Sequence, residues 1–452
     1  MSMREIAAYD VVVVGSGIAG TSAAVSAAEA DPRLRVAILS NGPLFSGSSF
    51  ASSTWGMGLV SAGAQGQEES LVRQIMAIGQ GRAEEHLVRS FVSGIEPAVA
   101  RAESWGVTFR QPSAQAQGEK EYIPCFDVRH RRWRGLERES WRKALGTRIR
   151  ALGVTVFERY ELMDILQDDR GGVSAVVAFE HRAQDFVLVQ AKSLVLATGG
   201  IASAFEGHIA GPDNTATAQA MAVACGARVV NLDCLQYMPT IVSPVDGVVF
   251  NEKMFRQVSV AQDVQEWIER ESGMALQEVL EMRSGYGPTT KRLPSYAVDR
   301  AILNAGEDGL PIKIEPANPA PEFVKTYCDW LEYAYGVKAD EPLRLGLRAQ
   351  ASNGGILVDE AAGTNVPGLY ACGECTGGMH GADRVGGLSS ANALVFGIRA
   401  GESAAKYALA AAGVPASSCL PAWANGSPAE CAHLRRQELR QETLRLFDMS
   451  SR

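Results

Sequence analysis

The sequence has little cysteine, little histidine and no excess of positive charge. It holds 8 Cys and 6 His in 452 residues, and 43 Lys and Arg stand against 51 Asp and Glu, for a net charge of −8. So few cysteines in so long a chain argue against a disulfide framework and favour a reducing, cytoplasmic location. The acidic balance argues against a nucleic-acid partner, because binding to phosphates needs an excess of Lys and Arg.

Long hydrophobic runs are absent as well. No apolar stretch approaches the ~20 residues of a membrane-spanning helix, so we expect no membrane partner. The short run Val11 to Val14 passes directly into glycines without a cleavage-site pattern, which predicts a strand rather than a signal peptide. The histidines are scattered, and Cys372 and Cys375 form a lone C-x-x-C pair, so we expect no metal site.

Glycine, in contrast, is abundant, with 46 residues in the chain. Its first cluster, Gly15, Gly17 and Gly20, follows the apolar run and precedes an alanine-rich stretch, Thr21 to Ala30. A second apolar run follows at Arg35 to Leu39. This order predicts a strand, a turn, a helix and a second strand. In such a Rossmann-type βαβ unit the glycines let the backbone approach the pyrophosphate of a dinucleotide.

The end of the second predicted strand indicates which dinucleotide is bound. Units that bind NAD usually carry an acidic residue here to hold the ribose. This sequence has Ser40-Asn41-Gly42-Pro43 instead, so NAD is disfavoured. Two distant segments, A-T-G-G at 197–200 and Y-A-C-G-E at 370–374, have the layout of a flavoprotein whose extended cofactor meets far-separated parts of the chain. FAD is therefore the predicted cofactor.

The remaining sequence predicts an α/β fold with an insertion. Helical patterns cover most of 71–106 and 137–153, and short β-rich pieces fill 154–190. Residues 234–344 change character, with several prolines and no dinucleotide-type unit, which indicates an inserted domain. A glycine loop then leads into a helix that ends near residue 410, and the last predicted helix covers 430–447.

Three further motifs carry a resemblance to a known family. L-S-N-G-P followed by S-G-S-S-F resembles the matching stretch of L-aspartate oxidases. M-A-V-A-C-G-A-R-V-V-N-L-D at 221–233 and H-G-A-D-R-V-G-G at 380–387 resemble the wider superfamily of succinate dehydrogenase, fumarate reductase and aspartate oxidase flavoproteins. The resemblance implies a discontinuous FAD-binding domain (1–233 and 345–410), an α+β capping domain (234–344) and a short helical tail (411–452). It also implies hydride transfer between a substrate carbon and flavin N5 beneath the cap.

The resemblance assigns FAD contacts residue by residue. The glycine turn would bind the pyrophosphate, Ser40 and Asn41 the adenosine side, and Glu374 the ribitol hydroxyls. Ser389 and Ser390 would begin a helix aimed at the N1/O2 edge of the flavin, where the positive end of a helix dipole stabilises reduced flavin. The full set of implied cofactor residues is Gly15, Ser16, Gly17, Ile18, Ala19, Gly20, Ser40, Asn41, Gly47, Ser48, Ser49, Gly56, Thr198, Gly199, Gly200, Gly373, Glu374, Ser389 and Ser390.

Two departures from the family pattern concern the cofactor. Members that bond FAD covalently use a His after the second strand, whereas this chain has Ser48-Ser49-Phe50 there and no His before residue 86. We therefore expect non-covalent FAD. The family's T-G-D-G appears as Thr215-Ala216-Thr217-Ala218, which removes an Asp and leaves one FAD contact open.

The substrate positions depart further. Dicarboxylate members use two His and two Arg, and three of these four positions align with Met238, Ser295 and Gln350, leaving Arg384. We expect an anionic substrate with one carboxylate on Arg384 and a less polar remainder against Trp55, Tyr237 or Met238. The proton could come from Tyr296 or Tyr122, or the reaction could need little help beyond flavin. His380 could order the loop before Arg384 or transfer protons.

The sequence thus predicts an FAD-dependent dehydrogenase, oxidase or reductase acting on a C–C or C–N bond of a small, mono-carboxylated molecule. Standard succinate, fumarate or aspartate chemistry is not expected, and the electron acceptor stays open. The alternative is a flavin-binding electron-transfer or structural subunit that has lost the parent catalysis.

Overall fold

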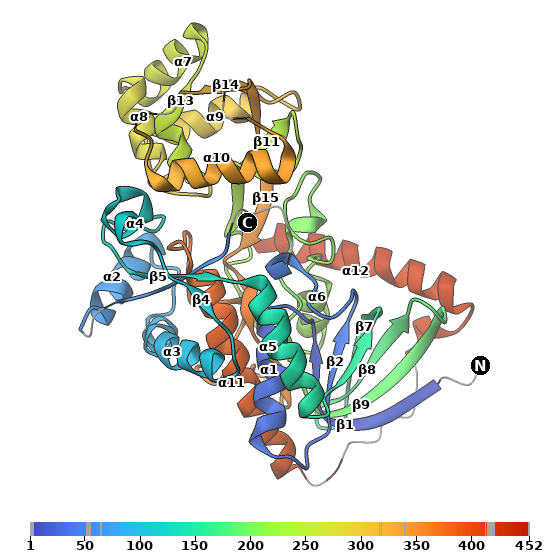
Figure 1. Ribbon diagram of the computed structural model, residues 1–452. Helices are drawn as coiled ribbons and strands as arrows, with labels where there is room; N and C mark the ends of the chain where they lie inside the picture. Colours follow the sequence, from blue (N-terminus) through green and yellow to red (C-terminus); the bar gives the residue numbers. More distant parts are fainter. Residues whose placement is uncertain are drawn as a thin grey trace.

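The computed structural model describes residues 4–50, 56–63, 66–315, 317, 319–338, 340–411, 413 and 421–450. These residues form a main domain, an inserted domain that we call the cap, and a long final helix (Figure 1). The α/β fold with an inserted α+β domain that the sequence predicted is confirmed.

A seven-stranded sheet forms the centre of the main domain, in the order β6-β2-β1-β9-β8-β7, with β17 also paired to β9. β1 is parallel to both β2 and β9, with Val11 opposite Val36 and Ser193, whereas β8 and β7 are antiparallel. The buried Val-rich run of β1 is the pattern of a strand covered on both faces. The strands are β1 (Arg4–Val14), β2 (Val36–Ser40), β6 (Thr155–Glu158), β7 (Tyr160–Gln167), β8 (Val173–Glu180), β9 (Asp185–Leu196) and β17 (Leu369–Ala371).

Two helices, α1 (Ile18–Ala30) and α11 (Leu388–Ala410), pack closely beside this sheet (Figure 1). A Cβ added to Gly401 of α11 would lie 2.1 Å from the carbonyl oxygen of Ala23, so glycine permits the close approach. The other helices of the main domain are α2 (Glu68–Ile78), α3 (Glu85–Ser104), α4 (Ala114–Gly118), α5 (Arg138–Ala151) and α6 (Thr217–Ala224). Two small sheets complete it, formed by β3 (Gly58–Ser61), β4 (Phe109–Arg110) and β5 (Arg132–Leu136), and by β10 (Val229–Val230), β16 (Gly355–Leu357) and β18 (Thr376–Gly377).

The cap has a separate core and stands above the main domain in Figure 1. The chain enters the cap on β11 (Leu235–Ser243) and leaves it on β15 (Leu343–Ser352), which pair antiparallel along most of their length. The other cap elements are β12 (Val248–Val249), β13 (Val258–Ser259), β14 (Leu310–Ile314), α7 (Gln262–Ser272), α8 (Leu276–Arg283), α9 (Tyr296–Asn304), α10 (Glu322–Tyr335) and a short 3-10 helix, η4 (Glu252–Gln257).

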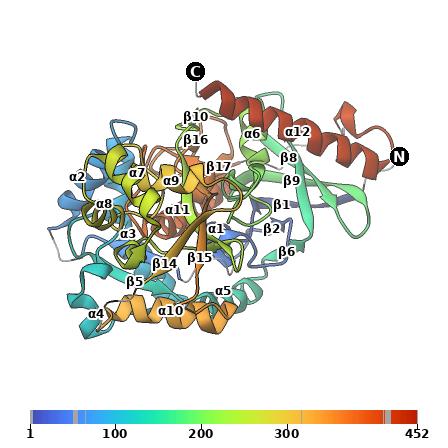
Figure 2. The ribbon, with the colours of Figure 1, turned by 90° about the horizontal axis from the view of Figure 1, so that it is seen from above.

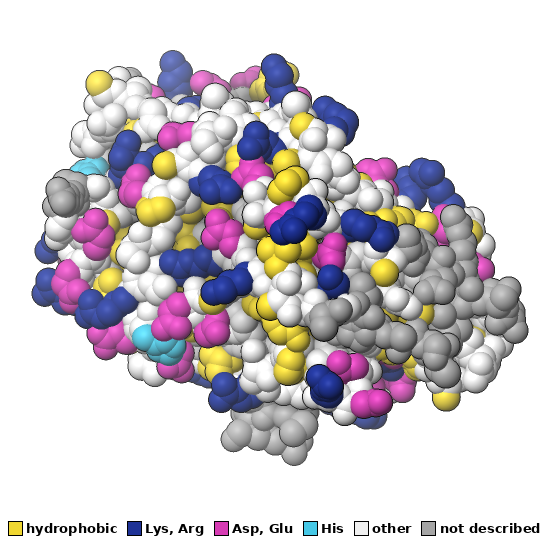
Figure 3. Space-filling model, turned by 90° about the horizontal axis from the view of Figure 1, so that it is seen from below, with side chains coloured by type: hydrophobic (Ala, Val, Ile, Leu, Met, Phe, Trp, Pro, Cys, Tyr) yellow, Lys and Arg dark blue, Asp and Glu magenta, His cyan; other side chains and the backbone are white. Residues whose placement is uncertain are grey.

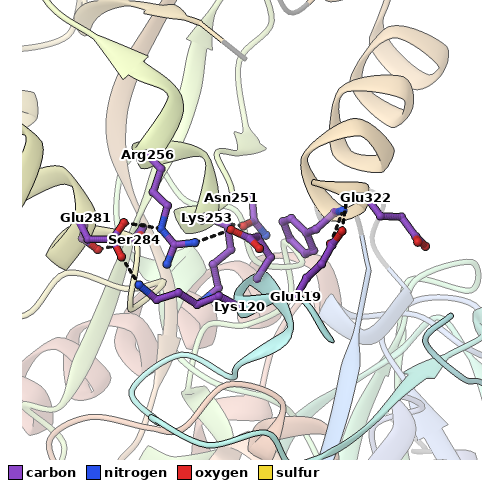
Figure 4. Close-up of polar contacts among 10 residues, drawn as sticks. Glu119, Lys120, Asn251, Lys253, Arg256, Glu281, Ser284 and Glu322 are labelled. Atoms are coloured by element: carbon purple, nitrogen blue, oxygen red, sulfur yellow. Dashed lines mark hydrogen bonds and ion pairs between the residues drawn. The ribbon is translucent and has the colours of Figure 1, made fainter. Parts of the chain in front are cut away.

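A polar network joins the cap to the segment around α4 (Figure 4). Arg256 on η4 pairs with Glu121 of the main domain and with Glu281 of α8. The backbone N–H of Glu322, at the start of α10, donates to the carboxylate of Glu119 at 2.9 Å. The cap therefore contacts the main domain through η4 and α10, in addition to its chain connections through β11 and β15.

The final helix, α12 (Pro428–Ser450), lies along β7, β9 and α6 (Figure 2). At its start, Cys431 and Ala432 pack against Phe179 and Phe186 of the sheet. Near its end, Phe447 packs against Ile201. Between Cys431 and Phe447 this helix therefore packs along the main domain.

In the part of the chain that the structure describes, no helix is both long enough and apolar enough to span a membrane. On the face shown in Figure 3, Lys and Arg side chains are interspersed with Asp and Glu, and hydrophobic side chains lie between them.

Candidate functional site

A cavity of about 730 Å³ lies at the carboxyl ends of β1, β2 and β9 and reaches the cap. In open α/β sheets, ligands bind at this edge because the loops that follow parallel strands meet there. Of the residues predicted from sequence to bind the cofactor, those lining the cavity are Gly15, Ser16, Gly17, Ile18, Ala19, Ser40, Asn41, Gly47, Ser48, Ser49, Gly56, Thr198, Gly199, Gly373, Glu374, Ser389 and Ser390.

The glycine turn after β1 is built for close backbone approach. Gly15 has φ +109°, and a Cβ there would lie 2.3 Å from the carbonyl oxygen of Ala197. A Cβ on Gly20 would lie 2.0 Å from the carbonyl oxygen of Gly15, so Gly20 serves this packing and does not line the cavity. α1 begins after Gly17 with no side-chain cap, which leaves N–H groups available to an anion.

Hydroxyl groups gather beside this helix end. The Oγ atoms of Ser16 and Ser40 lie 2.7 Å apart, and that of Ser46 lies 3.2 Å from Ser16. The Oγ of Ser48 accepts hydrogen bonds from the backbone N–H of Gly211 and the side chain of Asn214, both at 2.9 Å. Gly56 lines the cavity, whereas Trp55 and the rest of 51–55 lie outside the described residues.

Glu374 also lines the cavity, and its carboxylate accepts a hydrogen bond from the backbone N–H of Ser352 at 3.1 Å. Burial raises the pKa of Glu374 to about 7. The Thr198 hydroxyl and the Asn392 carbonyl oxygen, both buried in the lining, have no hydrogen-bond partner among the described residues. α11 begins after Gly387, again without a side-chain cap, and so presents N–H groups to the cavity beside Ser389.

Arg384 lines the cavity and contacts β11, the strand that leads into the cap. Its Nη2 donates to Oε1 of Gln236 at 3.2 Å, and burial lowers its pKa from the ordinary value. His380 is 4 % exposed, and neither ring nitrogen has a partner among the described residues. Burial lowers the pKa of His380 to about 3, so its imidazole is neutral near pH 7.

Two of the substituted substrate positions lie on the strands that lead into and out of the cap. Met238 on β11 is 6 % exposed and lines the cavity. Gln350 on β15 lies at a register shift, because Gln236 pairs with Ala351 and Tyr237 pairs with Ala349. An unpaired residue at such a bulge points in a different direction from its neighbours. Gln350 lines the cavity, and its side-chain amide oxygen has no hydrogen-bond partner among the described residues.

Other sequence candidates do not reach the cavity. Ser295 is fully buried, and its hydroxyl lies 2.8 Å from that of Tyr286 inside the cap. Tyr296 begins α9, whose buried face packs into the cap core. Tyr122 packs on the edges of Trp133 and Phe323. Tyr237 and Gly200 are likewise absent from the described lining.

The structure also brings in residues that the sequence did not point to. Cys125 lines the cavity and its Sγ donates to Oε1 of Glu252 on η4 at 2.8 Å. Burial raises the pKa of this thiol to about 12, so it is protonated near pH 7. Arg436 of α12 also lines the cavity. No sequence motif marks Cys125, Glu252 or Arg436, because these distant segments come together only in the fold.

The cavity fits the predicted FAD. It combines two uncapped helix N-termini, glycines that admit no Cβ and buried polar atoms without partners. These are the features that a pyrophosphate, a ribitol chain and a flavin edge require. Among the described residues no group of three or more His, Cys, Asp and Glu could hold a metal.

Comparison with known proteins places the chain in a family. The model of the FAD binding domain family matches residues 10–259 and 325–390. The chain is 28 % identical to an L-aspartate oxidase of Halobacterium salinarum, over 89 % of this chain and 77 % of the relative. It is 26 % identical to a fumarate reductase flavoprotein subunit of Serratia sp., over 90 % of this chain and 70 % of the relative.

A solved structure shows the same fold. Mycobacterium smegmatis Sdh1 in complex with UQ1 matches with a TM-score of 0.73 at 24 % identity, over 92 % of this chain and 71 % of the other. The sequence predictions of family and cofactor are confirmed. The chain is an FAD-dependent oxidoreductase that belongs to the FAD binding domain family, within the superfamily of succinate dehydrogenase, fumarate reductase and L-aspartate oxidase flavoproteins.

Proposed function

We propose that this oxidoreductase acts on a small substrate with one carboxylate and a less polar remainder, at a C–C or C–N bond. The observation that carries the proposal is the composition of the wall near the cap. There the described lining holds one cation, Arg384, beside the uncharged side chains of Met238 and Gln350. Bound FAD, held non-covalently, would supply hydride chemistry.

Arg384 suits a single carboxylate. A guanidinium stays cationic even where burial lowers its pKa, and its planar fork can donate two parallel hydrogen bonds. Gln236 holds one side of that fork through its carbonyl oxygen, which orients the remaining N–H groups. A second carboxylate would face the neutral side chains of Met238 and Gln350 and the carboxylate of Glu252, and burying an unpaired charge is costly.

Part of the cavity lining is apolar and suits the less polar part of the substrate. Ile209, Met238 and Val249 form a small hydrophobic cluster, and all three line the cavity. An aliphatic or unsaturated chain would therefore lie against this cluster while its carboxylate binds Arg384.

Proton transfer falls to the pair Cys125 and Glu252. Oxidation of a C–N or C–C bond releases a proton in addition to the hydride, and a carboxylate in the wall can take it. Glu252 lines the cavity and is 9 % exposed, and the thiol of Cys125 fixes one of its oxygens. In the reductive direction the same carboxyl group would return the proton. His380, neutral near pH 7, orders the loop before Arg384.

Anaerobic mixing tests the substrate class. The holoenzyme is mixed with amino, hydroxy and unsaturated acids that carry one carboxylate, and with the matching dicarboxylates, while flavin absorbance is followed. We expect bleaching or reoxidation by a monocarboxylate, and a loss of about a hundredfold in kcat/KM for Arg384→Gln, as expected when a charge-assisted bidentate contact is removed. Equal or better turnover of dicarboxylates, or unchanged turnover by Arg384→Gln, would refute the proposal.

We also propose a cytoplasmic location without a nucleic-acid or membrane partner. The seven described cysteines are all free thiols, in keeping with a reducing compartment. Mixed surface charge offers no broad basic face in the view of Figure 3. Fractionation of the native host, followed by immunoblotting, tests the location.

A further inference from the structure

We propose that Arg436 of α12 binds the adenosine half of FAD, so that the final helix closes one end of the cofactor site. Neither the family motifs nor the sequence pattern assigns this residue a role. The inference concerns cofactor binding alone and is independent of which substrate is used.

Arg436 is held in a defined position on the cavity wall. Its Nε lies 2.8 and 3.1 Å from the two carboxylate oxygens of Glu161 on β7, and its Nη2 lies 2.7 Å from one of them. The guanidinium also lies over the ring of Phe179, 5.0 Å from its centroid. The side chain nevertheless stays 36 % exposed, and Arg436 and Glu161 both line the cavity. A fixed, partly open guanidinium is suited to bind a ribose or an adenine ring.

Its neighbours mark this wall as the adenosine end. Nε2 of His181 lies 2.9 Å from Oδ1 of Asn41 and 3.3 Å from Oε2 of Glu161. The Nδ2 of Asn41 donates to Asp213 at 2.6 Å. Asn41 directly follows β2, where a dinucleotide-binding fold reads the ribose. The carboxylates of Glu161 and Asp213 thus stand next to the position where this chain lacks the usual acidic residue.

α12 also touches a second segment of the cavity wall. The buried hydroxyl of Thr443 lies 3.5 Å from the carbonyl oxygen of Ala216, which lines the cavity at the start of α6. Arg436 and Thr443 are about two turns apart, so one helix spans the wall from β7 to α6 (Figure 2). Cofactor binding and the docking of α12 are therefore linked.

The test separates the two halves of the cofactor. FAD is removed from the purified full chain, and the dissociation constants of FAD, FMN and ADP are measured by flavin fluorescence and by competition. For Arg436→Gln we expect FAD and ADP to bind about tenfold more weakly, the loss of one charge-assisted contact, with FMN unchanged because FMN lacks adenosine. Arg440→Gln, an exposed position on the same helix, is the matched control and should bind all three ligands as the parent does.

Each other outcome counts against the proposal. Equal losses for FAD and FMN in Arg436→Gln would show a general disturbance of the fold. Unchanged binding of FAD and ADP would show that Arg436 only anchors α12. Arg436→Lys keeps the charge but not the planar guanidinium, so we expect its loss of FAD affinity to be smaller than that of Arg436→Gln. If Arg436→Lys loses as much FAD affinity as Arg436→Gln and also has a lowered melting temperature, the effect is due to lost packing on Phe179.

Discussion

Gly200 makes room for Glu374. A Cβ added to Gly200 would lie 2.1 Å from Oε1 of Glu374, and that carboxylate lies in the wall of the FAD cavity. Gly200 itself is not among the described lining residues, so its part in the site is indirect. Gly200, the second glycine of the A-T-G-G segment, therefore leaves the space that the carboxylate of Glu374, 174 positions later, occupies.

Gly200→Ala should therefore reduce FAD binding more than stability. The obstructing atom is the far end of a flexible side chain, so Glu374 can swing aside at modest energetic cost. We expect FAD to bind at least about tenfold more weakly, because a charge-assisted hydrogen bond is lost. The melting temperature of the apoprotein should stay close to that of the parent. Gly118→Ala, where an added Cβ meets nothing within 4 Å, is the control. Normal FAD affinity in Gly200→Ala would contradict this role.

Gly401→Ala should have the opposite profile. Here the added Cβ would meet the backbone carbonyl of Ala23 on α1 at 2.1 Å, and backbone cannot move aside without separating α1 from α11. Although alanine is favoured over glycine in helices, we expect a net loss of about 1–3 kcal/mol in the free energy of unfolding. Urea unfolding of the apoprotein measures it. A variant as stable as the parent would show that the two helices tolerate a wider spacing.

His380 should make stability depend on pH. Its pKa is lowered by burial to about 3 in the folded chain, whereas an unfolded chain takes up the proton near 6.5. The unfolded state therefore binds more protons at acid pH, and stability is lost as pH falls from 6.5 toward 3. The slope from this residue is about 1.4 kcal/mol per pH unit.

Urea unfolding at a series of pH values, compared with His380→Phe, isolates this contribution. The Phe variant keeps a ring against Phe91 and cannot be protonated. Its stability should fall less steeply below pH 6.5 than that of the parent. Parallel curves for the two proteins would mean that His380 is protonated in the folded state.

FAD should be released when the protein is denatured. No histidine precedes residue 86, so the position that bonds flavin in covalent members is filled by Ser48-Ser49-Phe50. Acid precipitation of the holoprotein should leave FAD in the supernatant and a colourless pellet. Flavin that stays with the pellet through washing would demonstrate a covalent bond to another side chain.

Most of the residues that the sequence predicted to bind the cofactor line the cavity, whereas fewer of the predicted substrate residues do so. Gly15 and Gly17 sit within one local strand–turn–helix unit, whose geometry follows from neighbours in the chain. Cys125, Glu252 and Arg436 come from three segments with no such pattern, and they meet only through packing of the cap and α12. Tyr296, although near the aligned acid position, belongs to a helix whose buried face packs into the cap core.

Gln350 shows what a motif can and cannot predict. The alignment predicted the position, and the residue does line the cavity. That it does so through a register shift between β11 and β15 could not be read from the sequence, because a shift of one residue depends on the pairing of two distant strands.

The paired strands β11 and β15 both connect the cap to the main domain and line the cavity. Gln236 and Met238 on one strand and Gln350 and Ser352 on the other place their groups against Arg384, the cavity and Glu374. Under the proposed function, the two strands that connect the cap to the main domain therefore contribute substrate-binding side chains, in addition to Val249 and Glu252 elsewhere in the cap.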